Sequence, residues 1–323
     1  MPVGLDPIDH LLSLDLSRRG IARFFTPGGA LAAGRALLGA RRVLITTGFT
    51  LADGMPETDG PPGAAVLGTA LARLGAEVTY VSDAVNVPLI AACLTIFDTS
   101  AEIHVYPEGE DAAPTVLART RPTHLVAIER PGRTASGEYL SARAESVAPW
   151  NRPIDELFIV SRRAAAFSPG RARAGRRRRD EDRSAGRPVT VGIGDGGNEI
   201  GMGNVRTRVA RISPLMKRIG SAVRVDHLVV APVSNWGGYA IVAQLSRLAR
   251  RPLLHDAALE RRLIEACVEA GAHDGLTRRR EPTVDGLPMD VHAAAVTLLG
   301  RCIMDAGSAD GRSAHGRRGR KAS

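Results

Sequence analysis

RRVLITTGF, residues 41–49, is a short run of apolar and β-branched residues that predicts a buried strand. A polar loop containing ETDGPPG (57–63) follows it, and then an Ala- and Leu-rich segment (64–74) that favours a helix. EVTYVSD (77–83) indicates a second strand. A strand, a helix and another strand in this order form a βαβ unit, in which the two strands run parallel.

The same alternation continues along the chain. The first 40 residues favour helices, with a break at Gly28-Gly29. Further strands are expected at 101–107, 123–132, 189–194 and from 226, and further helices at 87–97, 112–120, 259–270 and 291–306. We therefore predict an α/β fold with a doubly wound, mostly parallel, Rossmann-like sheet and helices on both faces. One catalytic domain is expected over residues 1–306.

Composition points to a globular protein of a reducing compartment. The 323 residues are 44% hydrophobic, which is enough for a sizeable core. The three cysteines, Cys93, Cys267 and Cys302, are scattered and form no CxxC pair. Neither a membrane-spanning apolar stretch nor a secretory signal is recognisable, so we expect a cytoplasmic protein without a membrane partner.

The net charge of +9 is concentrated in two stretches. Residues 162–187 carry a net charge of +7 and residues 301–323 of +4, which leaves the rest of the chain close to neutral. We predict a disordered basic insertion at 162–187 and a disordered basic tail at 307–323, because neither has a hydrophobic period. A compositional bias toward Arg explains this charge more simply than nucleic-acid binding, which we do not expect.

Four polar, glycine-containing clusters each follow a predicted strand. They are TTGF with ETDGPPG, then IERPG, then GIGDGGNE, and finally PVSNWGG. The carboxyl ends of parallel strands share one edge of a sheet, where ligands bind. We therefore expect these loops to converge on one cleft, although they lie far apart in the sequence.

The glycine-rich cluster is the most unusual of the four. Gly192–Gly197 satisfies the GxGxxG pattern, but no acid follows about 20 residues later, as a dinucleotide site requires. Backbone N–H groups in such a loop can instead cradle a carboxylate or phosphate, and an ordinary tight turn is the simpler alternative. The cluster supplies two predicted catalytic acids, Asp195 and Glu199, and four predicted substrate-binding residues, Gly194, Gly196, Gly197 and Asn198.

The ETDG cluster places two carboxylates ahead of a helix. Thr58 or Asp59 can serve as the helix N-cap, which leaves at least one acid free for general base catalysis. We predict Glu57 and Asp59 as catalytic and Thr58 as substrate-binding. No cofactor is chemically required, although Mg²⁺ or Mn²⁺ could bind Glu57, Asp59, Asp195 and Glu199 through their oxygen atoms.

The two remaining clusters supply further binding residues. Arg130 suits a bidentate grip on a substrate carboxylate, with Glu129 holding its guanidinium; a surface ion pair is the alternative. Ser234, Asn235 and Trp236 are predicted to bind substrate, Asn235 through hydrogen bonds and Trp236 as an apolar wall, whereas Trp236 buried only for packing is the alternative. No P-loop or GxSxG motif is present.

Together these motifs resemble the D-glutamate cyclase family. The matching segments are TTGF with PETDGPPGA, IERPGR with SGEY, GIGDGGNEIGMGNV, VSNWGGYA and a late TVDGL, and they extend from Thr46 to Leu287. The resemblance implies a hydro-lyase that converts D-glutamate to 5-oxo-D-proline and water. It also implies a small-molecule partner, D-glutamate or a related amino dicarboxylate, and leaves homo-oligomerisation open. A nucleotide- or small-anion-binding regulatory protein is the alternative.

For the cyclisation we hypothesise one role for each group. Arg130 and the N–H groups of Gly196 and Gly197 would hold the two carboxylates. Asp59 or Glu57 would take the amine proton, and Glu199 or Asp195 would protonate the departing oxygen. The glycine loop and Asn235 would stabilise the oxyanion.

Overall fold

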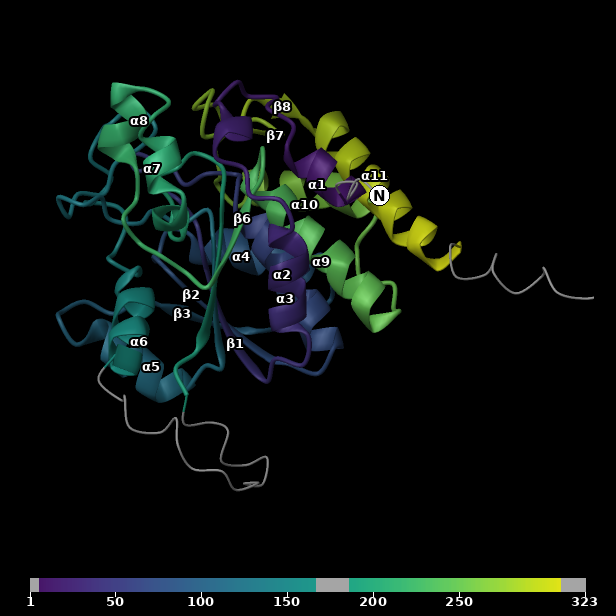
Figure 1. Ribbon diagram of the computed structural model, residues 1–323, viewed down its shortest axis with the longest axis horizontal. Helices are drawn as coiled ribbons and strands as arrows, with labels where there is room; N and C mark the ends of the chain where they lie inside the picture. Colours follow the sequence, from purple (N-terminus) through teal and green to yellow (C-terminus); the bar gives the residue numbers. More distant parts are fainter. Residues whose placement is uncertain (1–5, 167–185, 309–323) are drawn as a thin grey trace, which may run out of the picture.

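A six-stranded parallel sheet forms the centre of the protein (Figure 1). The computed structural model describes residues 6–166 and 186–308. The strands lie in the order β3-β2-β1-β4-β5-β6, and every neighbouring pair is parallel. Their bounds are β1 (Arg42–Thr47), β2 (Glu77–Ser82), β3 (Glu102–Val105), β4 (His124–Ile128), β5 (Val189–Gly194) and β6 (His227–Val230). The predicted α/β fold class is confirmed.

The strand order reverses between β1 and β4. β1 pairs with β2 on one side and with β4 on the other, so that Thr46 lies between Val81 and Ala127. In an open parallel sheet, ligands bind outside the carboxyl ends of the strands at such a reversal. The loops that follow β1 and β4 therefore start where this fold forms its binding crevice.

Apart from the edge strand β3, whose residues are exposed or half-buried, the strands are largely buried on both faces, which explains their continuous apolar runs. Along β1, Val43 and Ile45 point into one core while Leu44 points into the other. Because successive side chains of a strand alternate between the faces, a parallel strand covered on both sides needs apolar residues at every position.

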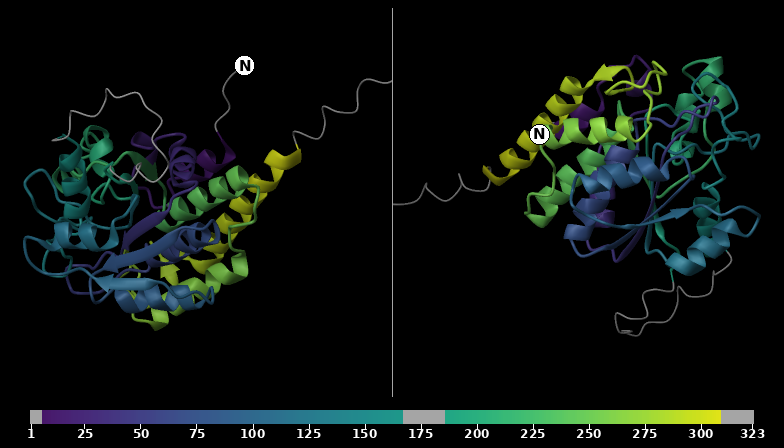
Figure 2. Two further views of the ribbon diagram at one scale, coloured as in Figure 1. Left: turned by 90° about the horizontal axis from the view of Figure 1, so that it is seen from below. Right: turned by 180° about the vertical axis from the view of Figure 1, so that it is seen from behind.

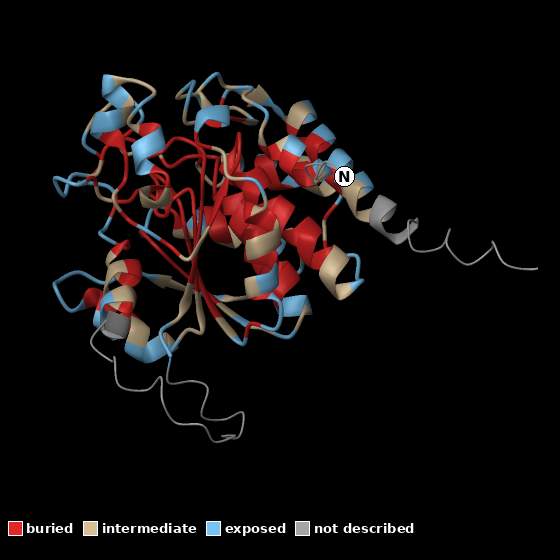
Figure 3. Cartoon of the chain, in the orientation of Figure 1, coloured by how far each residue is buried: buried red, intermediate tan, exposed pale blue. Residues whose placement is uncertain are grey.

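Helices cover both faces of the sheet. The larger layer contains α1 (Pro7–Leu12), α2 (Gly29–Leu37), α3 (Pro61–Arg73), α4 (Val87–Thr95), α9 (Ser234–Ala249), α10 (Ala257–Glu269) and α11 (Met289–Ser308). On the other face lie α5 (Ala112–Thr120), α6 (Glu156–Ala166) and α7 (Arg206–Val209). The views from below and behind show α10 and α11 on the side opposite α5 and α6 (Figure 2). Buried residues concentrate in the sheet and in the helices of the larger layer, α9 above all (Figure 3).

The predicted basic insertion falls largely outside the described residues. Its first part, residues 162–166, is helical and extends α6, so disorder from 162 was wrong there. Arg and Ala favour helices, and Arg162 also forms an ion pair with Asp226 at 3.2 Å. Arg187 binds the same carboxylate at 2.6 Å, so the two ends of the insertion meet at Asp226. Of the predicted tail, residues 309–323 lie outside the described part.

Two local features were not predicted from the sequence. The glycine cluster is followed by a 3₁₀ turn, Met202–Asn204, and the short α7 rather than by a long helix, because Gly201 and Gly203 disfavour a regular helix. A small hairpin, β7 (Thr283–Val284) and β8 (Leu287–Pro288), was not predicted. Within residues 6–166 and 186–308, no helix has both the length and the apolar character needed to cross a membrane.

Candidate functional site

A cavity of about 410 Å³ opens at the carboxyl edge of the sheet. The loops after β1, β4 and β5 line it, together with an N-terminal segment that contains Arg19 and the β7–β8 hairpin. Three of the four predicted clusters therefore line one cavity, whereas the fourth, PVSNWGG, reaches them through hydrogen bonds of Ser234 and Asn235 and contributes no lining residue. Of the thirteen predicted site residues, four line the cavity directly: Glu57, Asp195, Gly196 and Asn198.

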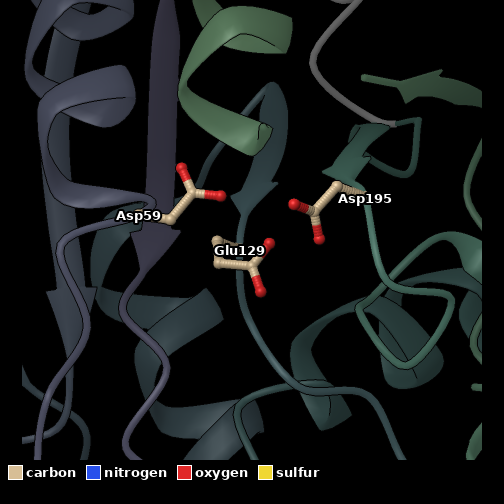
Figure 4. A group of neighbouring side chains, drawn as sticks. All are labelled: Asp59, Glu129 and Asp195. Carbon is tan, nitrogen blue, oxygen red and sulfur yellow. The ribbon is translucent and has the colours of Figure 1, made fainter. Parts of the chain in front are cut away.

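Three carboxyl groups meet where these loops leave the sheet (Figure 4), and two of them, those of Glu129 and Asp195, line the cavity. Asp59 precedes α3, Glu129 follows the last residue of β4, and Asp195 follows the last residue of β5. One oxygen of each lies within 4.8 Å of one oxygen of the other two. The three residues are only 2%, 6% and 1% exposed, respectively, so this group, which we call the carboxylate cup, is shielded from bulk water.

Glu129 is held in a strained position. Its φ of 42° is in the left-handed region, which costs a residue other than glycine about 1–3 kcal/mol. The Ser234 hydroxyl donates a 2.6 Å hydrogen bond to Glu129 Oε2 and fixes the carboxyl group in the cup. Strain of this kind is typical of functional sites.

Asp59 and Asn235 cap each other's helices. The backbone N–H groups of Ser234 and Asn235, the first two residues of α9, each donate a 2.8 Å hydrogen bond to the Asp59 carboxylate. In return, Asn235 Oδ1 accepts from Gly60 N at 3.0 Å and Gly63 N at 2.7 Å, at the start of α3. Asp59 therefore caps a helix far away in sequence rather than its own, and both helix N-termini point at the cup.

Replacing Asn235 with Ala should destabilise the fold by about 1–3 kcal/mol, because the buried N–H group of Gly63 would lose its acceptor, whereas Gly60 N keeps Asp59 Oδ1. Chemical denaturation measures this loss. Asp256→Ala, which removes the exposed N-cap of α10, is the matched control and should cost only about 1 kcal/mol. A smaller loss for Asn235→Ala than for Asp256→Ala would contradict the capping role.

The glycine loop encloses a carboxylate of the protein itself. Glu199 accepts hydrogen bonds from the backbone N–H groups of Asp195, Gly196 and Gly197, at 3.0, 2.5 and 2.8 Å. A Cβ atom at Gly194 would lie 2.9 Å from the Glu199 carboxyl carbon, which explains the glycine there. The loop is thus an anion nest as predicted from its glycines, but Glu199 occupies the donors that we had expected to bind substrate.

Arg19 is the arginine that pairs with two carboxylates lining the cavity. Its guanidinium lies 2.5 Å from Asp195 Oδ2 and 2.6 Å from Asp285 Oδ1. Asp15 positions it by accepting hydrogen bonds from the N–H groups of Arg19 and Gly20, at 2.8 and 2.9 Å. Arg19 thereby joins an N-terminal turn to the β7–β8 hairpin across the cavity.

Glu57 lies on the cavity wall without a side-chain hydrogen bond to any described residue. Its carboxyl group lies against Gly275, where a Cβ atom would be only 2.6 Å from the Glu57 carboxyl carbon. The loop after β1 carries Glu57, and Glu57 N donates to Phe49 O at 2.9 Å, which holds the loop over the strand end.

Burial and like charges raise the pKa of four carboxyl groups around the cavity. For Glu57 and Asp59, burial is the main cause, and the neighbouring Asp285 adds to it. For Glu129, burial is followed by repulsion from Glu199 and Asp59. Burial also raises the pKa of Asp195, although Arg19 opposes that rise. Carboxyl groups with raised pKa values can exchange protons near neutral pH.

Several predicted binding residues have partners away from the cavity. Arg130 is fully buried, and its guanidinium donates to Gly48 O at 2.9 Å and Arg152 O at 2.7 Å and pairs with Asp83. Trp236 Nε1 donates to His292 Nδ1 at 3.0 Å. Thr58 Oγ1 donates to Thr283 O at 2.8 Å. These contacts favour a structural role, so the predicted substrate contacts of these residues stay predictions.

Sequence reasoning missed three residues of the site. Glu129 was assigned only to support Arg130, although it directly follows a strand end, which is a signal for a ligand-facing position. Asp285 lies in a two-residue Asp285-Gly286 turn with φ values of 54° and 73°, and Val-Asp-Gly-Leu is a recognisable hairpin signature. Arg19 had no such signal, because its partners come from distant segments.

Comparisons with known proteins identify the family of the chain. A family model described as "D-glutamate cyclase-like, C-terminal" matches residues 8–170 and 179–300, which include every residue of the cavity discussed above. Human mitochondrial D-glutamate cyclase is 34% identical over 254 residues, which are 74% of this chain and 38% of the relative. The chain thus spans less than half the length of that relative. On these matches, the chain belongs to the D-glutamate cyclase-like family.

Proposed function

We propose that this protein is a hydro-lyase that converts D-glutamate to 5-oxo-D-proline and water. The reaction joins the α-amino nitrogen to the γ-carboxyl carbon and breaks one carbon–oxygen bond of that carboxyl group. Two protons leave the ammonium nitrogen, and two end on the departing oxygen, which leaves as water. The site must therefore accept a proton at one position and supply one at another.

One observation carries the proposal: several buried carboxyl groups with raised pKa values face a single cavity of substrate size. Glu57 and Asp195 line this cavity, whereas the oxygens of Asp59 and Glu199 accept backbone hydrogen bonds. Of the four acids predicted from sequence, we therefore assign the acid–base pair to Glu57 and Asp195. Holding the substrate in a folded conformation in the cavity would lower the activation free energy of cyclisation by up to roughly 7 kcal/mol.

Two arginines at the cavity mouth suit the carboxylates of an amino dicarboxylate. Arg18 and Arg143 line the cavity and are exposed, and neither forms an ion pair with a described residue. Arg143 makes one hydrogen bond, to Leu276 O at 3.1 Å. By contrast, a regulatory phosphate-binding role is less well supported, because Glu199 occupies the N–H groups of the glycine loop.

The direct test is incubation of the purified protein with D-glutamate or L-glutamate and chromatographic detection of 5-oxoproline. We expect turnover of the D enantiomer. Each assay is run with and without added Mg²⁺ and Mn²⁺. Absence of product from both enantiomers under all these conditions would refute the proposed activity.

A further inference from the structure

We propose that the carboxylate cup of Asp59, Glu129 and Asp195 binds the α-ammonium group of the substrate. The two carboxylates of the substrate then lie toward Arg18 and Arg143. The inference rests on the proposed function and adds the orientation of the substrate and the direction of proton transfer. It also assigns a binding role to Glu129, which the sequence did not single out.

The first argument is the supply of carboxylate oxygens that can accept a further hydrogen bond. Asp59 Oδ1 accepts from Asn235 N and Gly60 N, but its Oδ2 accepts only from Ser234 N. Glu129 uses Oε2 for the Ser234 hydroxyl, which leaves Oε1 free of described partners. Asp195 Oδ2 faces Arg19, and Asp195 Oδ1 has no partner among the described residues. One oxygen from each of three carboxylates matches the three N–H donors of an ammonium group.

The second argument is the charge that the cup leaves uncompensated. The Asp195 carboxylate of the cup shares the Arg19 guanidinium with Asp285, which lies outside the cup. The N-termini of α3 and α9 add only partial positive charge beside Asp59. Acidic groups therefore outnumber the positive charges around the cup, which favours a cationic group of the substrate there.

A further acid outside the cup also indicates a cationic ligand. Asp285 is 5% exposed and lines the same cavity, and its Oδ2 has no hydrogen-bond partner in the described part of the chain. Among the other residues that line the cavity, Arg18 and Arg143 are exposed and form no ion pair within the described part of the chain. The cavity is therefore negative at its buried side and positive at its mouth, which complements a zwitterion better than it complements a simple dicarboxylate.

This orientation assigns a direction to the proton transfers. The ammonium group in the cup gives one proton to Asp195, and the neutral amine attacks the γ-carboxyl carbon. As the carbon–nitrogen bond forms, Glu57 donates its proton to the departing oxygen. The second proton of the nitrogen also passes to that oxygen, water leaves, and Glu57 recovers its proton from Asp195.

Binding measurements test the cup separately from turnover. Calorimetry in a Glu57→Gln background compares D-glutamate with glutarate, which lacks the amino group. We expect D-glutamate to bind at least about 10-fold more tightly. Adding Glu129→Gln should weaken D-glutamate binding on the order of 10-fold and leave glutarate binding unchanged or tighter, because a repulsive charge is removed. Asp195→Asn is the second variant, and Glu77→Gln, an exposed acid on β2, is the control.

Each outcome decides the inference. Equal binding of D-glutamate and glutarate, or equal weakening of both by Glu129→Gln, would overturn it. The inference would also be overturned if electron paramagnetic resonance showed stoichiometric Mn²⁺ binding to the wild-type protein and no such binding to Glu129→Gln. The cup would then hold a metal ion. If wild-type protein produces no 5-oxoproline but binds D-glutamate in an amine-dependent way that Glu129→Gln abolishes, the cup stands and the proposed reaction fails.

Discussion

Replacing Glu57 with Gln should lower kcat for the conversion of D-glutamate by about 10²- to 10⁴-fold with little change in KM, as expected for loss of a general acid. Glu57 lines the cavity, and its pKa is raised by burial and then by Asp285 and Asp59, so it can carry a proton where an exposed glutamate would be ionised. Gln retains the shape but cannot donate that proton. Steady-state kinetics with 5-oxoproline detection measures the change.

Two further variants make this result specific. Glu77→Gln removes an exposed glutamate at the start of β2 and should leave kcat unchanged. Gly275→Ala keeps the Glu57 carboxyl group but displaces it, because the added Cβ would lie 2.6–2.9 Å from its atoms, and should lower kcat less than Glu57→Gln does. A Glu57→Gln enzyme with near-normal kcat would remove Glu57 from the mechanism.

Replacing Arg19 with Met should destabilise the protein by about 3 kcal/mol at neutral pH, the lower end of the cost of removing one partner from a buried ion pair, because the carboxylates are buried whereas Arg19 is 23% exposed. Asp195 and Asp285 would lose the cation that lies 2.5 and 2.6 Å from them. Since Arg19 opposes the rise in the pKa of Asp195, its removal raises that pKa further. Urea denaturation followed by circular dichroism measures the loss.

The loss should depend on pH with a definite sign. A carboxyl group whose pKa is higher in the folded than in the unfolded state binds more protons when folded, so stability falls as pH rises above the unfolded value, about 3.9 for Asp. The Arg19→Met penalty should therefore be small near pH 4 and grow toward pH 8. Adding Asp285→Asn should restore part of the stability. A penalty that is constant between pH 4 and pH 8 would show that Arg19 acts only through packing.

Local sequence patterns were sufficient to predict the strands of the sheet. The runs at 41–49, 77–83 and 123–132 contain β1, β2 and β4, because strands buried on both faces need apolar residues at nearly every position. The polar clusters after these runs indicated which edge of the sheet would hold the site. A parallel sheet gathers its strand ends at one edge, so this much follows without any tertiary detail.

The chemistry of the individual side chains could not be predicted in the same way. Asp59 was predicted as catalytic and Asn235 as substrate-binding, and Asp59 was also considered as a cap of its own helix. The structure shows that Asp59 caps α9, the helix that begins at Ser234, and that Asn235 caps α3, the helix that follows Asp59. Similarly, the Glu199 carboxylate fills the loop whose glycines indicated an anion site.

By itself, the sequence determined the fold class, the family resemblance and the edge of the sheet where acids and glycines accumulate, because these depend on patterns within short segments. Only the tertiary structure decided which acids face the cavity and which cation serves them. Arg19 and Asp285 meet across 266 residues of chain. Contacts of this kind depend on how helices and loops pack, and no local spacing encodes them.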